Sequence, residues 1–243
     1  PSIPVLHFSL DSINELFARF VEWEYATAML GILLGVNPFD QPDVEDTKKR
    51  VRQILNSNLE TVSNYRQIDC APTDYVRLLR ISDALWACRG IAADIDLSID
   101  EALRALLASL QPNDYFSINA FLPFRGYGRR EAMERMRNRV ASRLGNVACL
   151  EIGPRYLHST GQLHKGGPNN GVYLYLSADE PDDIGIPGEN FTLGILAATQ
   201  ARGDFEALAF RGRRALQVHL AGNDSETLAR FADRLCLAVS AIM

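Results

Sequence analysis

Apolar residues recur at helical spacing near the start of the chain. Between residues 11 and 34 the early apolar positions are Ile13, Leu16, Phe17, Phe20 and Val21. This spacing places them on one face of a helix, with Asp11 positioned as its N-cap and Gly35 as its stop. Residues 26–34 are apolar almost all round, which predicts that this helix is buried on several sides.

The same periodicity predicts three further helices before residue 111. They cover residues 41–57, 74–93 and 98–110. The last of them begins with Ser98 and Glu101 in capping-box spacing. After a short strand at 5–8, residues 1–110 are therefore expected to be almost wholly helical.

The pattern changes at residues 111–114, Gln-Pro-Asn-Asp. Residues 115–122 alternate apolar and polar, as a half-buried strand does. Downstream we expect a helix at 129–144, strands at 147–152 and 172–177, helices at 191–202 and 205–211, a strand at 215–220 and a helix at 225–242. This order matches a split βαβ, or ferredoxin-like, arrangement with one added helix. The predicted class is α+β, with a helical segment at 1–112 and a ferredoxin-like domain at 113–243.

Composition narrows the class of protein. The 243 residues are 47% hydrophobic and 23% charged, which is ordinary for a globular protein. A net charge of -5 argues against a protein that mainly coats nucleic acid. The arginine-rich run at 129–139 includes Glu131 and Glu134, so a solvated helix face is favoured there over a nucleic-acid site.

The cysteines and the chain ends bear on the cellular setting. The four cysteines are scattered without a CxxC pair, which favours free buried thiols in a reducing cytoplasm. There is no signal-peptide pattern, and no apolar run reaches the roughly 18 residues that span a bilayer. The sequence starts at Pro1 without a methionine, which suggests part of a longer chain.

Residues 37–48 carry the first candidate chemistry. Asp40 can cap the helix that follows, and Pro42 suits its first turn. Gln41 and Lys48 are seven residues apart, so they share a helix face about 10 Å apart along the axis. An amide and an ammonium on one face could hold a polyhydroxylated anion between them. A solvated amphipathic helix explains the same spacing.

The particular string favours the first explanation. Trp23-Glu24, then residues 35–41 (Gly-Val-Asn-Pro-Phe-Asp-Gln), then Val44-Glu45 and Lys48 resemble the C-terminal signature of phosphoglucose isomerases. The resemblance covers residues 12–55. It implies that Gln41 contacts the sugar phosphate and that Lys48 assists ring opening and proton movement. Asp43 departs from the signature, which has Gly there.

The resemblance also implies what this chain lacks. Such isomerases interconvert aldose and ketose phosphates through an enediolate, which requires a carboxylate base and an acid for ring opening. In the family the base is a Glu upstream of the signature, but Glu22 and Glu24 lie on the buried-looking first helix. The phosphate-binding loops of the sugar isomerase (SIS) fold are also missing. We therefore expect the C-terminal part of a glucose-6-phosphate isomerase, inactive alone and without cofactor or metal.

A loop rich in functional side chains is expected at 153–171. Four of its side chains could bind phosphate, namely Arg155, Ser159, Thr160 and Lys165. His158 or His164 could donate a proton near neutral pH. The chain lacks the HExxH, CxxC and GxSxG motifs that would favour a zinc site or a serine hydrolase. A purely structural connection is the alternative.

A second resemblance covers most of the chain. Residues 158–168, Gly203-Asp204 and Gly212-Arg213-Arg214 look like the tail of bacterial fused transaldolase–glucose-6-phosphate isomerases. It implies that a transaldolase and the main SIS lobes precede this segment. We expect His158 or His164 to lie beside the Gln41–Lys48 helix, from the same chain or from a partner subunit.

Two other functions fit the sequence. The small α/β part could sense a phosphosugar without chemistry, or it could support a homodimer. Apolar faces on the first helices favour dimer formation.

Overall fold

The computed structural model describes most of the chain. The described residues are 6–40, 42–56, 66–68, 76–79, 99–122, 128–178, 183–220 and 222–242. They divide into two compact units, Pro1–Pro42 and Asp43–Met243. The boundary expected after residue 112 falls inside the second unit.

The described residues of the first unit form the helix α1 (Ile13–Leu34). Ser12 caps it, because its side chain accepts the N–H of Glu15, and Gly35 ends it in the left-handed region at φ 67°. The predicted bounds are confirmed to within two residues, although Ser12 rather than Asp11 is the cap. Most of its large apolar side chains, including Trp23, are exposed, so the predicted burial on several sides is not seen.

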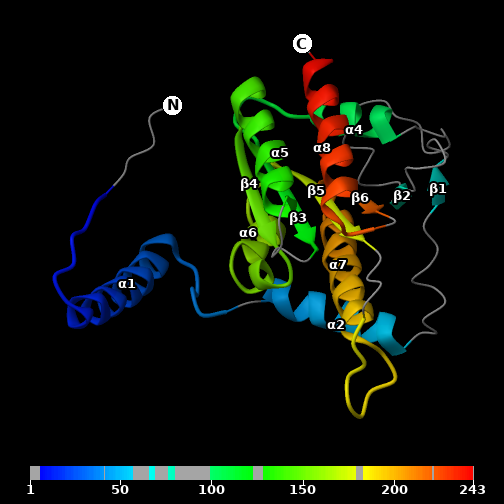
Figure 1. The fold of residues 1–243 in the computed structure, drawn as a ribbon. Helices are drawn as coiled ribbons and strands as arrows, with labels where there is room; N and C mark the ends of the chain where they lie inside the picture. Colours follow the sequence, from blue (N-terminus) through cyan, green and yellow to red (C-terminus); the bar gives the residue numbers. More distant parts are fainter. Residues whose placement is uncertain are drawn as a thin grey trace. The chain divides into compact units, whose positions relative to one another are not determined.

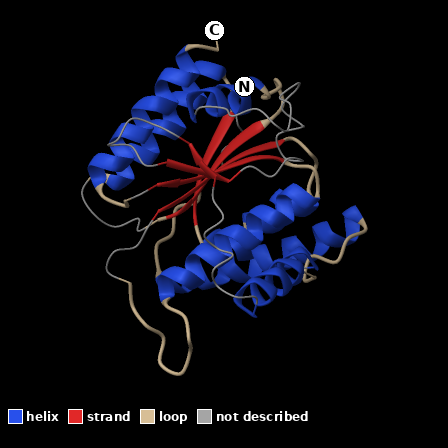
Figure 2. Cartoon of the chain, turned by 90° about the vertical axis from the view of Figure 1, so that its right-hand side faces the viewer, coloured by secondary structure: helices blue, strands red, loops and turns tan. Residues whose placement is uncertain are grey.

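The second unit is built on one six-stranded sheet. Its strands are β1 (Arg66–Ile68), β2 (Val76–Leu79), β3 (Tyr115–Phe121), β4 (Val147–Ile152), β5 (Gly171–Ala178) and β6 (Arg214–Leu220). The spatial order is β1-β2-β6-β5-β3-β4. The last four strands in the sequence are mutually parallel, while β2 pairs antiparallel with β6 and β1 with β2. Figure 2 shows this sheet as a twisted fan between two groups of helices.

Helices cover both faces of the sheet. Three of them, α4 (Ile99–Ala108), α5 (Arg129–Leu144) and α8 (Ser225–Ser240), share one apolar core with β3, β5 and β6. Within this group α5 and α8 lie side by side (Figure 1). The other face carries the 3-10 turn η2 (Arg155–His158), α6 (Thr160–Gly166) and α7 (Leu193–Phe210). Helix α2 (Pro42–Asn56) contacts α7 near Gly203.

The two faces of the sheet differ in chemistry. The α4–α5–α8 face is dry, with buried residues such as Phe116, Leu174 and Val218. The α7 face carries Asn119, Tyr175 and Gln217, which pair side by side across three strands and are fully buried. The alternation at 115–122 therefore reflects two buried faces of different polarity, and not one face open to water.

The ferredoxin-like prediction is not confirmed. In a ferredoxin-like sheet an antiparallel strand lies between the two parallel strands of each split βαβ unit. Here β3, β4, β5 and β6 are all parallel to one another. The cause lies in residues 153–170, which were expected to be a loop but contain η2 and α6. This connection is a helical crossover, which lets β5 run parallel to β4. The helices expected at 191–202 and 205–211 form one helix, α7.

Two smaller predictions differ as well. Residues 76–79, expected to be helical, form β2, and the rest of the predicted 74–93 helix lies outside the described residues. Residues 6–8 form no strand. Cys149 and Cys236 are free thiols, partly buried, while the other two cysteines lie outside the described residues. No described helix combines the length and apolar character needed to cross a membrane.

The turn that precedes β3 is fixed by a buried ion pair. The Arg214 guanidinium at the start of β6 donates to Asp114 Oδ2 at 2.6 Å and to the Ser109 carbonyl at 2.6 Å. Asn146 donates to the backbone carbonyls of Gln111 and Asp114 at 2.8 and 3.0 Å. The side chains of Arg214 and Asp114 are only 10% and 8% exposed. The pair therefore joins α4, β3 and β6 at one edge of the sheet.

Asp114→Ala should destabilise the second unit. The substitution leaves the Arg214 charge buried without its partner, which typically costs about 3–5 kcal/mol of unfolding free energy. Urea denaturation followed by circular dichroism measures the change. As a control, Glu134→Ala removes the exposed Arg130–Glu134 pair and should leave the midpoint nearly unchanged. Equal effects of the two substitutions would contradict this account of the Arg214 pair.

Candidate functional site

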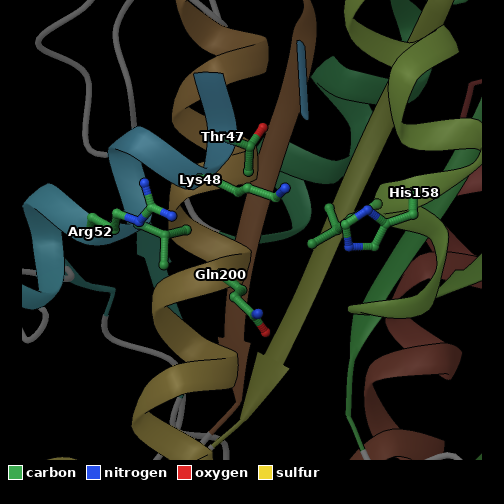
Figure 3. A pocket seen from close by; sticks show the side chains of 7 residues that line it. Thr47, Lys48, Arg52, His158 and Gln200 are labelled. Atoms are coloured by element: carbon green, nitrogen blue, oxygen red, sulfur yellow. The ribbon is translucent and has the colours of Figure 1, made fainter. Parts of the chain in front are cut away.

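Lys48 and His158 line one cavity (Figure 3). The cavity has a volume of about 190 Å³. Lys48 comes from α2, and His158 is the last residue of η2, more than 100 positions later in the sequence. In Figure 3 the Lys48 side chain extends toward the His158 ring. The lining residues are Thr47, Lys48, Val51, Arg52, Leu157, His158 and Gln200.

Helix α2 supplies one wall through residues that share a face. Lys48 and Arg52 are four residues apart and therefore project from consecutive turns. Lys48 Nζ lies 2.6 Å from Glu45 Oε1, and this hydrogen bond lowers the pKa of the Glu45 carboxyl. The cations Lys48 and Arg52 and the imidazole of His158 thus border the cavity. This donor set suits an anionic ligand.

The η2 turn supplies the opposite wall. Tyr156 and Leu157 are buried and anchor the turn, while His158 is exposed at its end. Gly153, directly after β4, lets the backbone pass close to the Phe121 ring, because a Cβ there would lie 2.6 Å from that ring. The sequence at this point therefore places a histidine at the protein surface on a turn that the core holds in place.

The other predicted ligand residues that the structure describes do not line this cavity. Gln41 lies outside the described residues. Arg155 and Ser159 are exposed, and the Ser159 hydroxyl donates to the Tyr156 carbonyl at 3.2 Å. Thr160 begins α6 and is half-buried. The structure thus brings together Lys48 and His158 and leaves Arg155, Ser159 and Thr160 outside the cavity lining.

His164 is enclosed among aromatic rings. Its imidazole centroid lies 5.0 Å from that of Tyr173 and 5.8 Å from that of Tyr156, and the residue is only 2% exposed. Burial lowers its pKa to about 4; the Asp204 carboxylate raises this pKa by less, and the Lys165 ammonium lowers it further. The ring is therefore neutral near pH 7 and does not reach the cavity. Of the two histidines considered, only His158 lies beside Lys48.

Lys165 belongs to a buried ion pair. Its Nζ lies 2.5 Å from Asp204 Oδ1, and both side chains are 1% exposed. The hydroxyls of Tyr156 and Tyr175 donate to Asp204 Oδ2 at 2.8 and 2.5 Å. Lys165, Tyr156 and Tyr175 thus supply three donors to the buried Asp204 carboxylate. The Lys165 ammonium is therefore engaged inside the protein and does not face a ligand.

Three polar lining residues, Thr47, Arg52 and Gln200, were not predicted from the sequence. Arg52 lies one turn from Lys48 on the same face of α2, so helical periodicity could have found it, whereas Thr47 lies on an adjacent, buried part of the helix. Gln200 could not be found in this way, because its place depends on how α7 packs against α2. The described residues contain no group of three or more His, Cys, Asp or Glu side chains placed to hold a metal ion.

The buried imidazole predicts a pH dependence of stability. Because the pKa of His164 is about 4 when folded and near 6.5 when unfolded, the unfolded state binds the extra proton between these values. The unfolding free energy should therefore fall as the pH drops from about 6.5 toward about 4. His164→Phe should make this dependence shallower, as measured by urea denaturation across the range. An unchanged slope in the variant would contradict a buried neutral His164.

Comparisons with known proteins give a partial relation. No protein-family profile matches the chain. Glucose-6-phosphate isomerases from two strains of Leptospira biflexa serovar Patoc are 46% identical over 55 residues, which cover 22% of this chain and 12% of each isomerase. A hypothetical protein from Thermus thermophilus is similar in fold, with a TM-score of 0.52 at 16% identity over 66% of this chain and 43% of that one. The chain thus spans a minor part of the length of these proteins. A segment of it is related to glucose-6-phosphate isomerase.

Proposed function

We propose that this chain supplies the C-terminal part of a glucose-6-phosphate isomerase site. The reaction would interconvert glucose 6-phosphate and fructose 6-phosphate through an enediolate. The observation that carries the proposal is the shared cavity of Lys48 and His158. Lys48 was assigned from an isomerase-like signature, and a 55-residue match to isomerases supports a relation to that enzyme. His158 reaches the same cavity from a distant segment.

The proposed roles follow from the chemistry of the groups. Lys48 is a cation that can stabilise charge on the substrate oxygens during ring opening and enediolate formation. His158 is exposed at the cavity and can exchange a proton with the ring oxygen. Arg52 adds a second cation one turn along α2, where it suits the phosphate group. Gln200 offers an amide to a sugar hydroxyl.

The cavity is only part of a site. Its volume of about 190 Å³ falls below the roughly 300–1,000 Å³ of typical small-molecule pockets. Among the described residues that line it there is no carboxylate, although the reaction requires one as the base. We therefore propose that the base and the remaining walls come from outside this segment, and that the segment alone is inactive.

The proposal extends to the whole enzyme. The tail resemblance, which includes Gly203-Asp204 and Gly212-Arg213-Arg214, supports a transaldolase–isomerase fusion in which the SIS lobes precede this segment. The short span of the match relative to the isomerases is compatible with such a longer chain. A homodimer is part of the same proposal.

A non-catalytic function is the second candidate. The absence of a carboxylate among the described lining residues favours a module that binds a phosphosugar without turning it over. Such a module would regulate a neighbouring domain or support dimer formation. The two candidates differ in what the Lys48 ammonium does, and substitution separates them.

Lys48→Ala in the full-length protein tests the catalytic role. Loss of a group that acts on the transition state should lower turnover by roughly 10²–10⁴-fold. The fold should persist, because Lys48 is exposed and its ion pair with Glu45 is a surface pair. Coupled spectrophotometric assay of fructose 6-phosphate formation gives kcat, and circular dichroism checks the fold.

The adjacent Lys49 provides a matched control. Lys49 is exposed on the same helix but does not line the cavity, so Lys49→Ala should keep normal turnover. Normal turnover in Lys48→Ala, combined with an altered response to a phosphosugar effector, would favour the regulatory function. Loss of the dimer or of the fold in Lys48→Ala would favour a structural one.

A further inference from the structure

Two adjacent residues of α7, Gly203 and Asp204, contact the two walls of the cavity separately. The sequence marks this pair only through the tail resemblance, which assigns it no role. Asp204 bonds η2, which carries His158, and Gly203 meets α2, which carries Lys48. Neither residue lines the cavity, so any influence on a ligand must act through the walls.

Asp204 holds the His158 wall at two points. Its carboxylate accepts the Tyr156 hydroxyl at 2.8 Å, two residues before His158, and the Lys165 ammonium at 2.5 Å, seven residues after it. The end of this segment is held as well, because the buried Arg213 donates to the Lys165 and Gly167 carbonyls at 2.7 and 2.5 Å. His158 therefore sits on a short segment whose two ends are anchored inside the protein.

Gly203 holds the Lys48 wall by having no side chain. A Cβ on Gly203 would lie 2.8 Å from Val51 Cγ2 and 3.7 Å from the Thr47 carbonyl oxygen. Thr47 and Val51 both line the cavity and flank Lys48 on α2. A Cβ at this position would require Val51 to shift, so Gly203 allows the present close contact between α2 and α7.

The third wall belongs to α7 itself. Gln200 lies three residues before Gly203 and four before Asp204, so all three lie on neighbouring turns of one helix. A single rigid helix thus contributes one lining residue and fixes both of the other walls. Gly203 and Asp204 therefore restrain the movement of the Lys48 wall and of the His158 wall relative to each other.

We propose that Gly203 and Asp204 are positioning residues that set Lys48 and His158 on opposite walls of one cavity. Asp204 acts through Tyr156, and Gly203 acts through Val51. The consequence for turnover rests on the proposed isomerase function, whereas the placement of His158 relative to α2 does not. These two parts can fail separately in experiment.

Two tyrosine variants separate positioning from general core stability. Tyr156→Phe and Tyr175→Phe each remove one hydroxyl that donates to the same oxygen of Asp204, and each keeps the buried ring. Only Tyr156 lies on η2, whereas Tyr175 lies on β5 in the centre of the sheet. A merely structural role of these hydrogen bonds predicts similar effects of the two, and positioning predicts an effect of Tyr156→Phe alone.

The placement is measured by NMR on the chain. Nuclear Overhauser contacts between the His158 ring and the Val51 methyl groups report the separation of the walls. We expect these contacts to weaken in Tyr156→Phe and to persist in Tyr175→Phe. Gly203→Ala is an independent variant, because alanine favours the α7 helix while its methyl group displaces Val51. The same contacts should weaken in it, and it carries the test if Tyr156→Phe does not fold.

The consequence for function is measured in the full-length protein. Because small misplacements of reacting groups are costly, kcat for fructose 6-phosphate should fall on the order of 10-fold or more in Tyr156→Phe and Gly203→Ala. Tyr175→Phe should stay close to the wild type. Unchanged His158–Val51 contacts in both Tyr156→Phe and Gly203→Ala, or equal losses in both tyrosine variants, would overturn the positioning role. Weakened contacts with unchanged kcat would retain the positioning and count against the isomerase function.

Discussion

The buried Asp204 carboxylate is the interaction on which the α7 side of the molecule depends. An isolated ionised carboxyl in the interior is very costly, so it must be compensated where it lies. Here the compensation comes from Lys165, Tyr156 and Tyr175, which belong to α6, η2 and β5. A helix, a turn and a central strand therefore all bond to the two carboxylate oxygens of Asp204. Apolar packing alone would tolerate small shifts between these elements, whereas directional bonds to a charge do not.

One face of the sheet contributes mainly to stability, and the other carries the elements that form the cavity. The face under α4, α5 and α8 is apolar and gains free energy from burial of side chains such as Leu174 and Val218. The other face gives up part of that gain to bury polar groups such as Asn119 and Asp204. All residues that border the cavity belong to elements on this polar side. A site that needs fixed geometry is thus placed where directional bonds hold the elements.

Sequence patterns predicted the long elements well and their arrangement poorly. The bounds of α5, α8 and the four parallel strands agree with the predictions to within a few residues, because each has a clear apolar period. The segment at 153–170 was misjudged, since its glycines and polar residues suggested a loop and hid α6. That one error changed a parallel sheet into a ferredoxin-like one. The resemblance to phosphoglucose isomerases implied that His158 or His164 lies beside Lys48. His164 could not be set aside until its enclosure by Tyr115, Tyr156 and Tyr173 was known.

The short ion pair between Lys48 and Glu45 has a consequence for any anion that enters the cavity. With Nζ 2.6 Å from a carboxylate, the ammonium already has a negative partner. The hydrogen bond from Lys48 lowers the pKa of Glu45, which favours the ionised form of this partner. A ligand that contacts Lys48 must therefore exchange with Glu45 rather than add to an unoccupied charge. Because both side chains are exposed, this pair is weak, and an anion that is better placed at Lys48 can replace Glu45 at little cost.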